Sequence, residues 1–170
     1  MIIELANVGT TVKKLELQFD PAEIDLEGEV VTLTDKATLD GELFRSERGA
    51  QLDGHLRADV SLDCTRCLDP IAKTIDLKFR AVFVDASAEN KADEHEVKEE
   101  ALDESFVEDG QIDLAEVVRE QILLAMPEQV FCWEDCKGLC PKCGTNLNLI
   151  DCKCADDEVD PRWAALKSLK

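Results

Sequence analysis

Four close pairs of cysteines constrain this chain more than any other feature of its 170 residues. A tetrahedral zinc site takes four ligands, and two cysteines a few residues apart can supply two of them from one turn. Four pairs therefore suffice for two all-thiolate sites, and such closed coordination is typical of structural rather than catalytic zinc. We predict about two structural zinc ions as cofactors, bound by Cys64, Cys67, Cys132, Cys136, Cys140, Cys143, Cys152 and Cys154.

The spacing favours one grouping of these pairs without excluding another. In Cys140-Pro-Lys-Cys143-Gly144, proline stiffens the turn and glycine allows a positive φ, so that backbone N–H groups can reach the sulfurs. Only eight residues separate this motif from Cys152, so the last four cysteines can close a local site. The first four would then tie the C-terminal region to the preceding sheet. The exchanged grouping, in which Cys64 and Cys67 join Cys140 and Cys143, stays open because spacing does not determine connectivity.

Two other uses of the cysteines fit the sequence less well. An even number of cysteines also allows four disulfides, which a reducing compartment disfavours. Cys64-Thr-Arg-Cys67 has the spacing of a thioredoxin-type dithiol, whose reactive thiol lies at a helix N-terminus. Here the motif joins two predicted strands, and Leu68-Asp69-Pro70 does not start a helix, so we expect no dithiol enzyme.

Charge restricts the class of partner. Asp and Glu number 38 against 19 Lys and Arg, a formal net charge of −19, which repels phosphate and favours basic proteins as partners. The N-terminal segment lacks the charged and apolar regions of a signal peptide. No apolar run approaches the roughly 20 residues of a membrane helix, so we predict a cytoplasmic protein without membrane contact.

Period-two alternation of apolar and polar residues predicts antiparallel strands at 55–63 and 75–83, joined by a turn that carries Cys64 and Cys67. Further strands are expected near residues 12–19, 29–33 and 38–44, with turn signals at Asp20-Pro21 and Asp40-Gly41. Residues 85–110 hold eleven acids and two lysines, which predicts a solvated linker.

A helix is predicted at 113–126, before Pro127. Asp113 and Glu116 have the spacing of a capping box, and Ile112 and Val117 that of a hydrophobic staple. Its apolar stripe should pack on the sheet: Leu114, Val117, Val118, Ile122 and Ala125. A second, short helix should begin at Asp160-Pro161. Both histidines, His55 and His95, are expected to be solvated rather than catalytic.

These elements predict an α+β fold with a mostly antiparallel β-sheet or open barrel, one packed helix and a zinc-bound C-terminal module. The expected organisation is a β-sheet domain at 1–127, including the acidic linker at 85–110 and the helix at 113–126. A cysteine-rich zinc module with the short terminal helix should follow at 128–170. No set of nucleophile, base and acid is visible, so we predict that the chain is not an enzyme.

Four motifs follow one another along the chain: DCTRCLDP, EDGQIDLAEVVREQILLAMP, CWEDCKGLCPKCGTNLN and DPRWAALKSL. In these motifs and in their order the chain resembles, over about residues 55–170, the YceD family of large ribosomal RNA subunit accumulation proteins. The resemblance carries over Cys64 and Cys67 with Arg66, the helix around Asp113 and Glu120, and residues 138–144. Some members of the family have fewer C-terminal cysteines, which would make the second metal site optional for function.

The resemblance implies a non-catalytic bacterial factor, with plastid relatives, that supports accumulation or processing of the large-subunit ribosomal RNA. The expected partner is a basic ribosomal protein or a pre-large-subunit particle. Large-subunit protein thirty-two is the first candidate, because its gene commonly neighbours those of the family. Direct RNA contact is left open around Lys137, Lys142, Lys153 and Arg162. The alternatives are a zinc-ribbon adaptor in transcription or another protein complex and, third, a dithiol oxidoreductase.

Overall fold

The computed structural model of the chain describes residues 1–26, 30–46, 49–85, 104–154 and Arg162. The chain forms two compact units. The sheet unit comprises Met1–Asp63 and Pro70–Glu128, and the cysteine unit comprises Cys64–Asp69 and Gln129–Lys170. The chain therefore leaves the sheet unit at Asp63, returns to it at Pro70, and leaves it again after Glu128.

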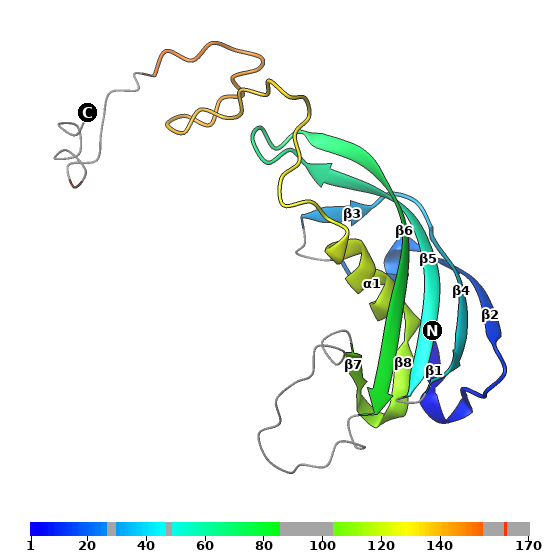
Figure 1. Cartoon of the computed structure of the whole chain (residues 1–170). Helices are drawn as coiled ribbons and strands as arrows, with labels where there is room; N and C mark the ends of the chain where they lie inside the picture. The colour runs from blue at the N-terminus through cyan, green and yellow to red at the C-terminus, as the bar shows by residue number, and fades with distance from the viewer. Residues whose placement is uncertain (27–29, 47–48, 86–103, 155–161, 163–170) are drawn as a thin grey trace. The chain divides into compact units, whose positions relative to one another are not determined.

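The sheet unit contains a mostly antiparallel six-stranded sheet, a separate pair of strands and one helix (Figure 1). In the six-stranded sheet the order is β2-β4-β5-β6-β7, with β3 also paired to β5, and only the β6–β7 pair is parallel. β1 and β8 form the antiparallel pair. The strands are β1 (Ile2–Glu4), β2 (Lys13–Phe19), β3 (Val31–Leu33), β4 (Ala37–Arg45), β5 (Ala50–Asp63), β6 (Pro70–Asp85), β7 (Glu104–Val107) and β8 (Gln111–Asp113). Helix α1 spans Leu114–Leu124.

The predicted strand-rich fold with one helix is confirmed, and the sheet is open. Alternation along β5 buries every second residue, among them Leu52, Leu56 and Val60, and leaves Arg57 and Asp59 exposed. The predicted stripe of α1 is buried at Leu114, Val117, Val118 and Ile122. Full burial of each of these aliphatic side chains contributes about 1.5–3 kcal/mol, so the sheet unit has an apolar core of its own.

The turn predicted at Asp40-Gly41 is wrong, because β4 runs through both residues. Gly41 lies opposite Gly54 of β5 in the antiparallel register. A Cβ on Gly41 would lie 2.8 Å from the carbonyl oxygen of Asp53, and one on Gly54 would lie 2.6 Å from two ring atoms of Phe79. These glycines therefore permit close packing within the sheet rather than a reversal of the chain.

The linker predicted at 85–110 is wrong at its C-terminal end. Residues Glu104–Val107 form β7, which pairs in parallel with the end of β6, and a 3-10 turn follows at Glu108–Gly110. Val107 is buried, so this end of the acidic segment packs into the sheet unit, which its acidic composition did not indicate. Residues 86–103 lie outside the described residues, as does the short helix predicted at Asp160-Pro161.

Helix α1 begins as predicted but is capped by a simpler arrangement. Asp113 is the N-cap and accepts a hydrogen bond from the backbone N–H of Ala115 at 3.0 Å. Glu116 does not complete a capping box; it accepts a hydrogen bond from Arg119 at 3.2 Å. The helix ends at Leu124, two residues earlier than predicted. Within the described part of the chain, no helix combines the length and apolar content needed to cross a membrane.

The contact between Gly54 and Phe79 predicts that Gly54→Ala lowers the free energy of unfolding of the sheet unit by about 1–3 kcal/mol, the usual cost of overpacking a core. Urea denaturation followed by circular dichroism measures the change. Gly9→Ala is the matched control, since the nearest atoms to a Cβ there lie 3.9 Å away and its effect should be small. Equal stability of the two variants would contradict this account of the packing between Gly54 of β5 and Phe79 of β6.

Candidate metal centres

The described residues of the cysteine unit form no apolar core of the usual kind. Among its described residues, every buried apolar side chain is a cysteine: Cys64, Cys67, Cys136 and Cys140. Its larger apolar side chains Trp133, Leu149 and Ile150 are exposed. A segment this short cannot be stabilised by so little buried area, and such segments usually depend on disulfides or metal ions. The arrangement of the sulfurs therefore determines how this unit holds together.

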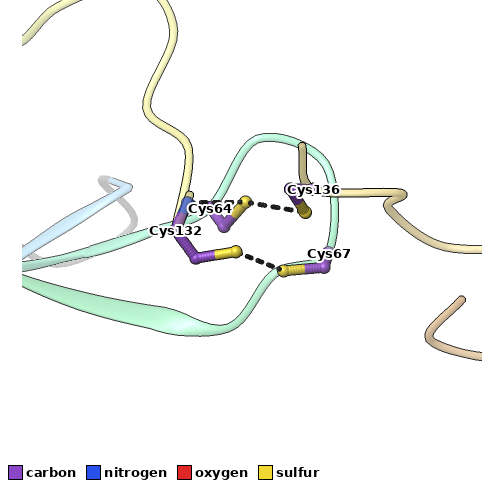
Figure 2. Close-up of side chains that lie close together, drawn as sticks. All are labelled: Cys64, Cys67, Cys132 and Cys136. Carbon is purple, nitrogen blue, oxygen red and sulfur yellow. Dashed lines mark hydrogen bonds between the residues drawn. The ribbon is translucent and has the colours of Figure 1, made fainter. Parts of the chain in front are cut away.

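The first cluster consists of Cys64, Cys67, Cys132 and Cys136 (Figure 2). The first two lie in the turn between β5 and β6, and the other two follow α1 in the chain. Their four sulfurs lie within 4.8 Å of one another. The Sγ atoms of Cys64 and Cys136 are 3.8 Å apart, and those of Cys67 and Cys132 are 3.5 Å apart.

The second cluster consists of Cys140, Cys143, Cys152 and Cys154, again with all sulfurs within 4.8 Å of one another. The Sγ atom of Cys152 lies 3.4 Å from that of Cys140 and 3.5 Å from that of Cys143. Cys143 and Cys154 are exposed, whereas three members of the first cluster are buried. The structure thus groups the cysteines in the local arrangement of the sequence analysis and not in the exchanged one.

The size of both clusters fits a metal ion bound by four thiolates. With zinc–sulfur bonds of about 2.3 Å, the edges of a thiolate tetrahedron measure about 3.8 Å. The four close sulfur pairs lie between 3.4 and 3.8 Å apart. A disulfide requires about 2.05 Å, and all eight cysteines are free thiols here. Each cluster could therefore hold one metal ion.

The two C-x-x-C turns share one backbone geometry. The N–H of Leu68 donates to the carbonyl of Cys64, and the N–H of Gly144 donates to that of Cys140, both at 2.9 Å. The donor residue has positive φ in each turn, 61° for Leu68 and 71° for Gly144. Leucine rarely adopts this conformation, so the first turn carries backbone strain that glycine avoids in the second. The glycine after Cys143 predicted the second turn, whereas no residue after Cys67 signals the positive φ of Leu68.

Polar groups surround the sulfurs of the first cluster. Cys64 accepts a hydrogen bond from the backbone N–H of Cys132 at 3.4 Å, and Cys136 accepts one from the side-chain amide of Asn148 at 3.3 Å. Asp69 accepts hydrogen bonds from Cys67 and from Asn146, each at 3.2 Å. None of the three polar residues Asp69, Asn146 and Asn148 was predicted to contact the cysteines. Their only sequence signal is that they follow cysteine motifs closely.

The thiols of one cluster do not ionise alike. Burial opposes the thiolate of Cys64, but hydrogen bonds from the backbone N–H groups of Cys67 and Arg66 outweigh it and lower its pKa to about 6. Burial instead raises the pKa of Cys67. In the second cluster, the hydrogen bond with the Thr145 side chain lowers the pKa of Cys143 to about 6. Crowded thiolates repel one another, and a bound cation would let all four ionise together.

Arg66 braces the first cluster without contributing a ligand. Its guanidinium donates to the carbonyl oxygens of Glu134 at 3.3 Å and Cys136 at 3.0 Å. The same group lies 4.1 Å from the centre of the Phe131 ring, a cation–π contact. The carbonyl of Arg66 accepts from the N–H of Leu139 at 3.0 Å. One side chain and its backbone thus hold several parts of the segment after α1.

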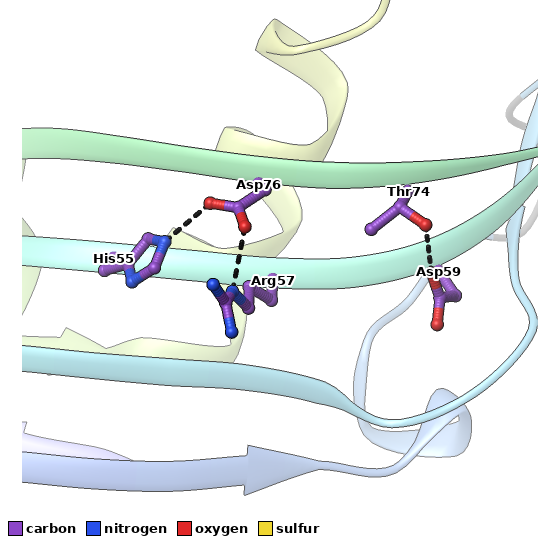
Figure 3. A network of polar contacts seen from close by, with 5 residues as sticks. All are labelled: His55, Arg57, Asp59, Thr74 and Asp76. Atoms are coloured by element: carbon purple, nitrogen blue, oxygen red, sulfur yellow. Dashed lines mark hydrogen bonds and ion pairs between the residues drawn. The ribbon is translucent and has the colours of Figure 1, made fainter.

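His55, the histidine that the structure describes, takes part in a different kind of contact. His55 lies on the polar face of β5, where its Nε2 atom is 2.6 Å from an oxygen of Asp76 on β6 (Figure 3). Arg57 donates to the other carboxylate oxygen at 2.9 Å. The hydrogen bonds from His55 and Arg57 hold the pKa of Asp76 below its usual value. This is cross-strand pairing on a solvated sheet face, and His95 lies outside the described residues.

Comparison with known proteins places these residues in a family context. The sequence profile described as "Large ribosomal RNA subunit accumulation protein YceD" matches residues 52–170, a range that includes all eight cysteines. An uncharacterized protein of Mycobacterium tuberculosis is 31% identical over 150 residues, which cover 86% of this chain and 68% of that protein. The uncharacterized protein YlbN of Bacillus subtilis is 30% identical over 118 residues, covering 69% and 64%.

A plant relative has a functional name. The chloroplastic Large ribosomal RNA subunit accumulation protein YCED homolog 1 of Arabidopsis thaliana is 26% identical over 154 residues, which cover 76% of this chain and 47% of that protein. No solved structure matches the chain. The geometry of the two clusters therefore rests on the present structure.

Two glycines allow a test of how tightly the cysteine unit is packed. Gly138 and Gly144 both have positive φ, but a Cβ on Gly138 would lie 2.9 Å from the carbonyl oxygen of Arg66, whereas one on Gly144 would meet nothing within 4 Å. Gly144→Ala should cost about 1–2 kcal/mol through backbone strain alone. Gly138→Ala should cost more, because the backbone of Arg66 must also move.

Urea unfolding monitored by Trp133 fluorescence, in a Trp163→Phe background, measures both effects in the cysteine unit. A smaller loss for Gly138→Ala than for Gly144→Ala would show that Arg66 and Gly138 are not packed as described.

Proposed function

Because this chain belongs to the YceD family, we propose that it is a non-catalytic factor that supports accumulation or processing of the large-subunit ribosomal RNA. The single observation that carries the proposal is the family match over residues 52–170, which spans both cysteine clusters. The names of the chloroplastic relatives from Arabidopsis and maize support the same role. This role would place the chain with assembling ribosomes in the bacterial cytoplasm.

Each cluster would hold one structural zinc ion. The first would be bound by Cys64, Cys67, Cys132 and Cys136, and the second by Cys140, Cys143, Cys152 and Cys154. Zinc supplies a rigid cross-link between four thiolates and leaves no open coordination position for a substrate. The support for this assignment is that cysteines are the only buried apolar side chains among the described residues of the cysteine unit.

The charge of the chain favours a protein partner over naked RNA. With a net charge of −19, the chain is repelled by phosphate and attracted by the basic proteins of the large subunit. We infer that it binds or escorts a basic ribosomal protein and reaches the RNA through it. Large-subunit protein thirty-two is the first candidate, on the gene neighbourhood of the family.

A zinc-ribbon adaptor in transcription is the second candidate function. The shared geometry of the two C-x-x-C turns favours it, because such turns are common in zinc ribbons that bind other proteins. Co-sedimentation separates the two functions. A ribosome-assembly factor should migrate with pre-large-subunit particles, whereas a transcription adaptor should migrate with the polymerase.

The zinc assignment predicts about two zinc ions per chain after purification without added metal, measured by atomic emission. Strong chelation should unfold the cysteine unit, because structural zinc contributes on the order of 10–16 kcal/mol in small peptides. The sheet unit should keep its circular dichroism. Cys152→Ser should reduce the content to about one zinc ion and leave the first cluster loaded. Purified chain with no zinc, or with four disulfides, would contradict the assignment and leave the family membership intact.

The partner assignment predicts that purified basic ribosomal protein associates with the chain, at a rate that falls as salt rises from about 50 to about 200 mM. Added ions shorten the reach of the electrostatic attraction and therefore slow the encounter. Stopped-flow fluorescence of Trp133 and Trp163 follows the reaction, and protein-free large-subunit RNA is the control. Tight binding to that RNA, without affinity for any basic ribosomal protein, would overturn the proposal.

A further inference from the structure

A groove of about 510 Å³ lies in the sheet unit, far in sequence from the first cysteine pair. It is formed by residues of β7, β8 and the first half of α1, together with one residue each of β1 and β6. Its size falls within the range of pockets that bind organic groups or side chains. None of its lining residues is basic. Neither the two cysteine clusters nor the family resemblance explains the presence of this groove.

The groove has an apolar interior with two exposed walls. Phe83 and Ile112 line it and are buried, which makes them a fixed floor. Phe106 of β7 and Ile2 of β1 also line it, and they remain 50% and 60% exposed. Large apolar side chains that stay exposed beside a pocket are typical of a binding surface. The groove therefore suits the insertion of a bulky apolar side chain.

Three carboxylates border the same groove along α1. Asp113, Glu116 and Glu120 follow one another at spacings of three and four residues, so they lie along one side of the helix. Asp113 is 3.3 Å from the Met1 ammonium, and Glu116 pairs with Arg119 at 3.2 Å. Glu120 has no ion-pair partner among the residues that the structure describes. The border is thus acidic, and the described residues do not pair the charge of Glu120.

We propose that this groove docks a basic, amphipathic segment of a partner protein. A large apolar side chain of the partner inserts between Phe106 and Ile2, and its flanking lysines or arginines pair with Glu120, Glu116 and Asp113. The assignment of a ribosomal protein as the natural partner rests on the proposed function. The preference for an apolar anchor beside basic residues rests on the groove alone.

Charge complementarity selects this occupant over two others. A second copy of the chain carries a net charge of −19 and would be repelled by the acidic border. Residues 86–103 of the same chain contain seven acids and two lysines, so they carry the same sign of charge as the border. A segment rich in lysine and arginine is attracted from a distance and can neutralise Glu120 on binding.

The test uses the full zinc-loaded chain, labelled with ¹⁵N, and a synthetic peptide in which leucine and phenylalanine stand between pairs of lysine and arginine. We expect chemical-shift changes confined to the groove, namely β7, β8, residues 114–120 of α1, and the lining residues Ile2 and Phe83. A peptide with serine in place of the apolar residues should bind at least about 10-fold more weakly, since a buried aromatic anchor usually dominates such an interface. A peptide with glutamate in place of the basic residues should not bind.

Two groove variants and two controls locate the site. Phe106→Ala should weaken the peptide at least about 10-fold, and Glu120→Lys should weaken it and reduce its salt dependence. Leu124→Ala, on the same helix but 77% exposed and outside the groove, should change nothing. Glu128→Lys repeats the charge change of Glu120→Lys at an exposed position outside the groove and should have a smaller effect. Because Glu120 is exposed, its substitution should leave the fold intact, and an unchanged circular dichroism spectrum of the variant checks this.

The inference is overturned if the shifts map elsewhere, if Phe106→Ala binds normally, or if the serine peptide binds as well as the anchored one. Deletion of residues 86–103 tests whether this segment occupies the groove. Tighter peptide binding after the deletion would show that the segment competes with the peptide and is the occupant instead. Co-sedimentation with pre-large-subunit particles separates this inference from the proposed function. If the wild-type chain co-sediments but the groove does not bind the peptide, the inference is wrong and the proposed function stands. If the groove binds the peptide but the chain does not co-sediment, only the proposed function is wrong.

Discussion

The mutual approach of eight cysteine sulfurs is the interaction on which the cysteine unit depends. No other apolar side chain is buried among its described residues, so hydrophobic burial of the usual kind cannot hold it. Two thiolates brought to 3.5 Å repel each other, and a cation at the centre converts that repulsion into attraction. Backbone turns, Arg66 and Asn148 then fix the positions of the sulfurs. The described part of the unit consists of two clusters of four cysteines and the chain that connects them.

The register of β5 and β6 in the sheet unit determines where the turn with Cys64 and Cys67 begins and ends. Asp63 lies opposite Pro70 in that register, so the six residues between them must reverse direction within one turn. Cys64 and Cys67 lie in this turn, and their spacing from the strand ends is set by the pairing. The long apolar rows of β5 and β6 therefore stabilise the turn that carries Cys64 and Cys67 as well as the core.

Some of this organisation could be predicted from the sequence. Strict alternation along β5 and β6 indicated both strands, since a half-buried strand has no other simple pattern. Cysteine spacing indicated the local cluster, because short loops close easily. β1, β7 and β8 were missed, being only three or four residues long, too short for periodicity to register. Asp40-Gly41 was misjudged because a glycine that permits close packing and a glycine that permits a turn look the same in sequence. The groove could not be predicted from the sequence, since it is lined by residues as far apart in the chain as Ile2 and Glu120.

The sequence separation of the ligands imposes an order on assembly. Only eight residues separate the two halves of the second cluster, Cys143 and Cys152, whereas 64 residues separate Cys67 from Cys132. For flexible chains, closing the longer loop costs about 2 kcal/mol more in entropy. Folding of the sheet unit removes that difference, because it condenses most of the intervening residues. If each cluster binds an ion, the second could capture it as soon as its own segment has been synthesised. Capture at the first cluster would wait until the strands and α1 have folded, so that its ion would mark a folded sheet unit.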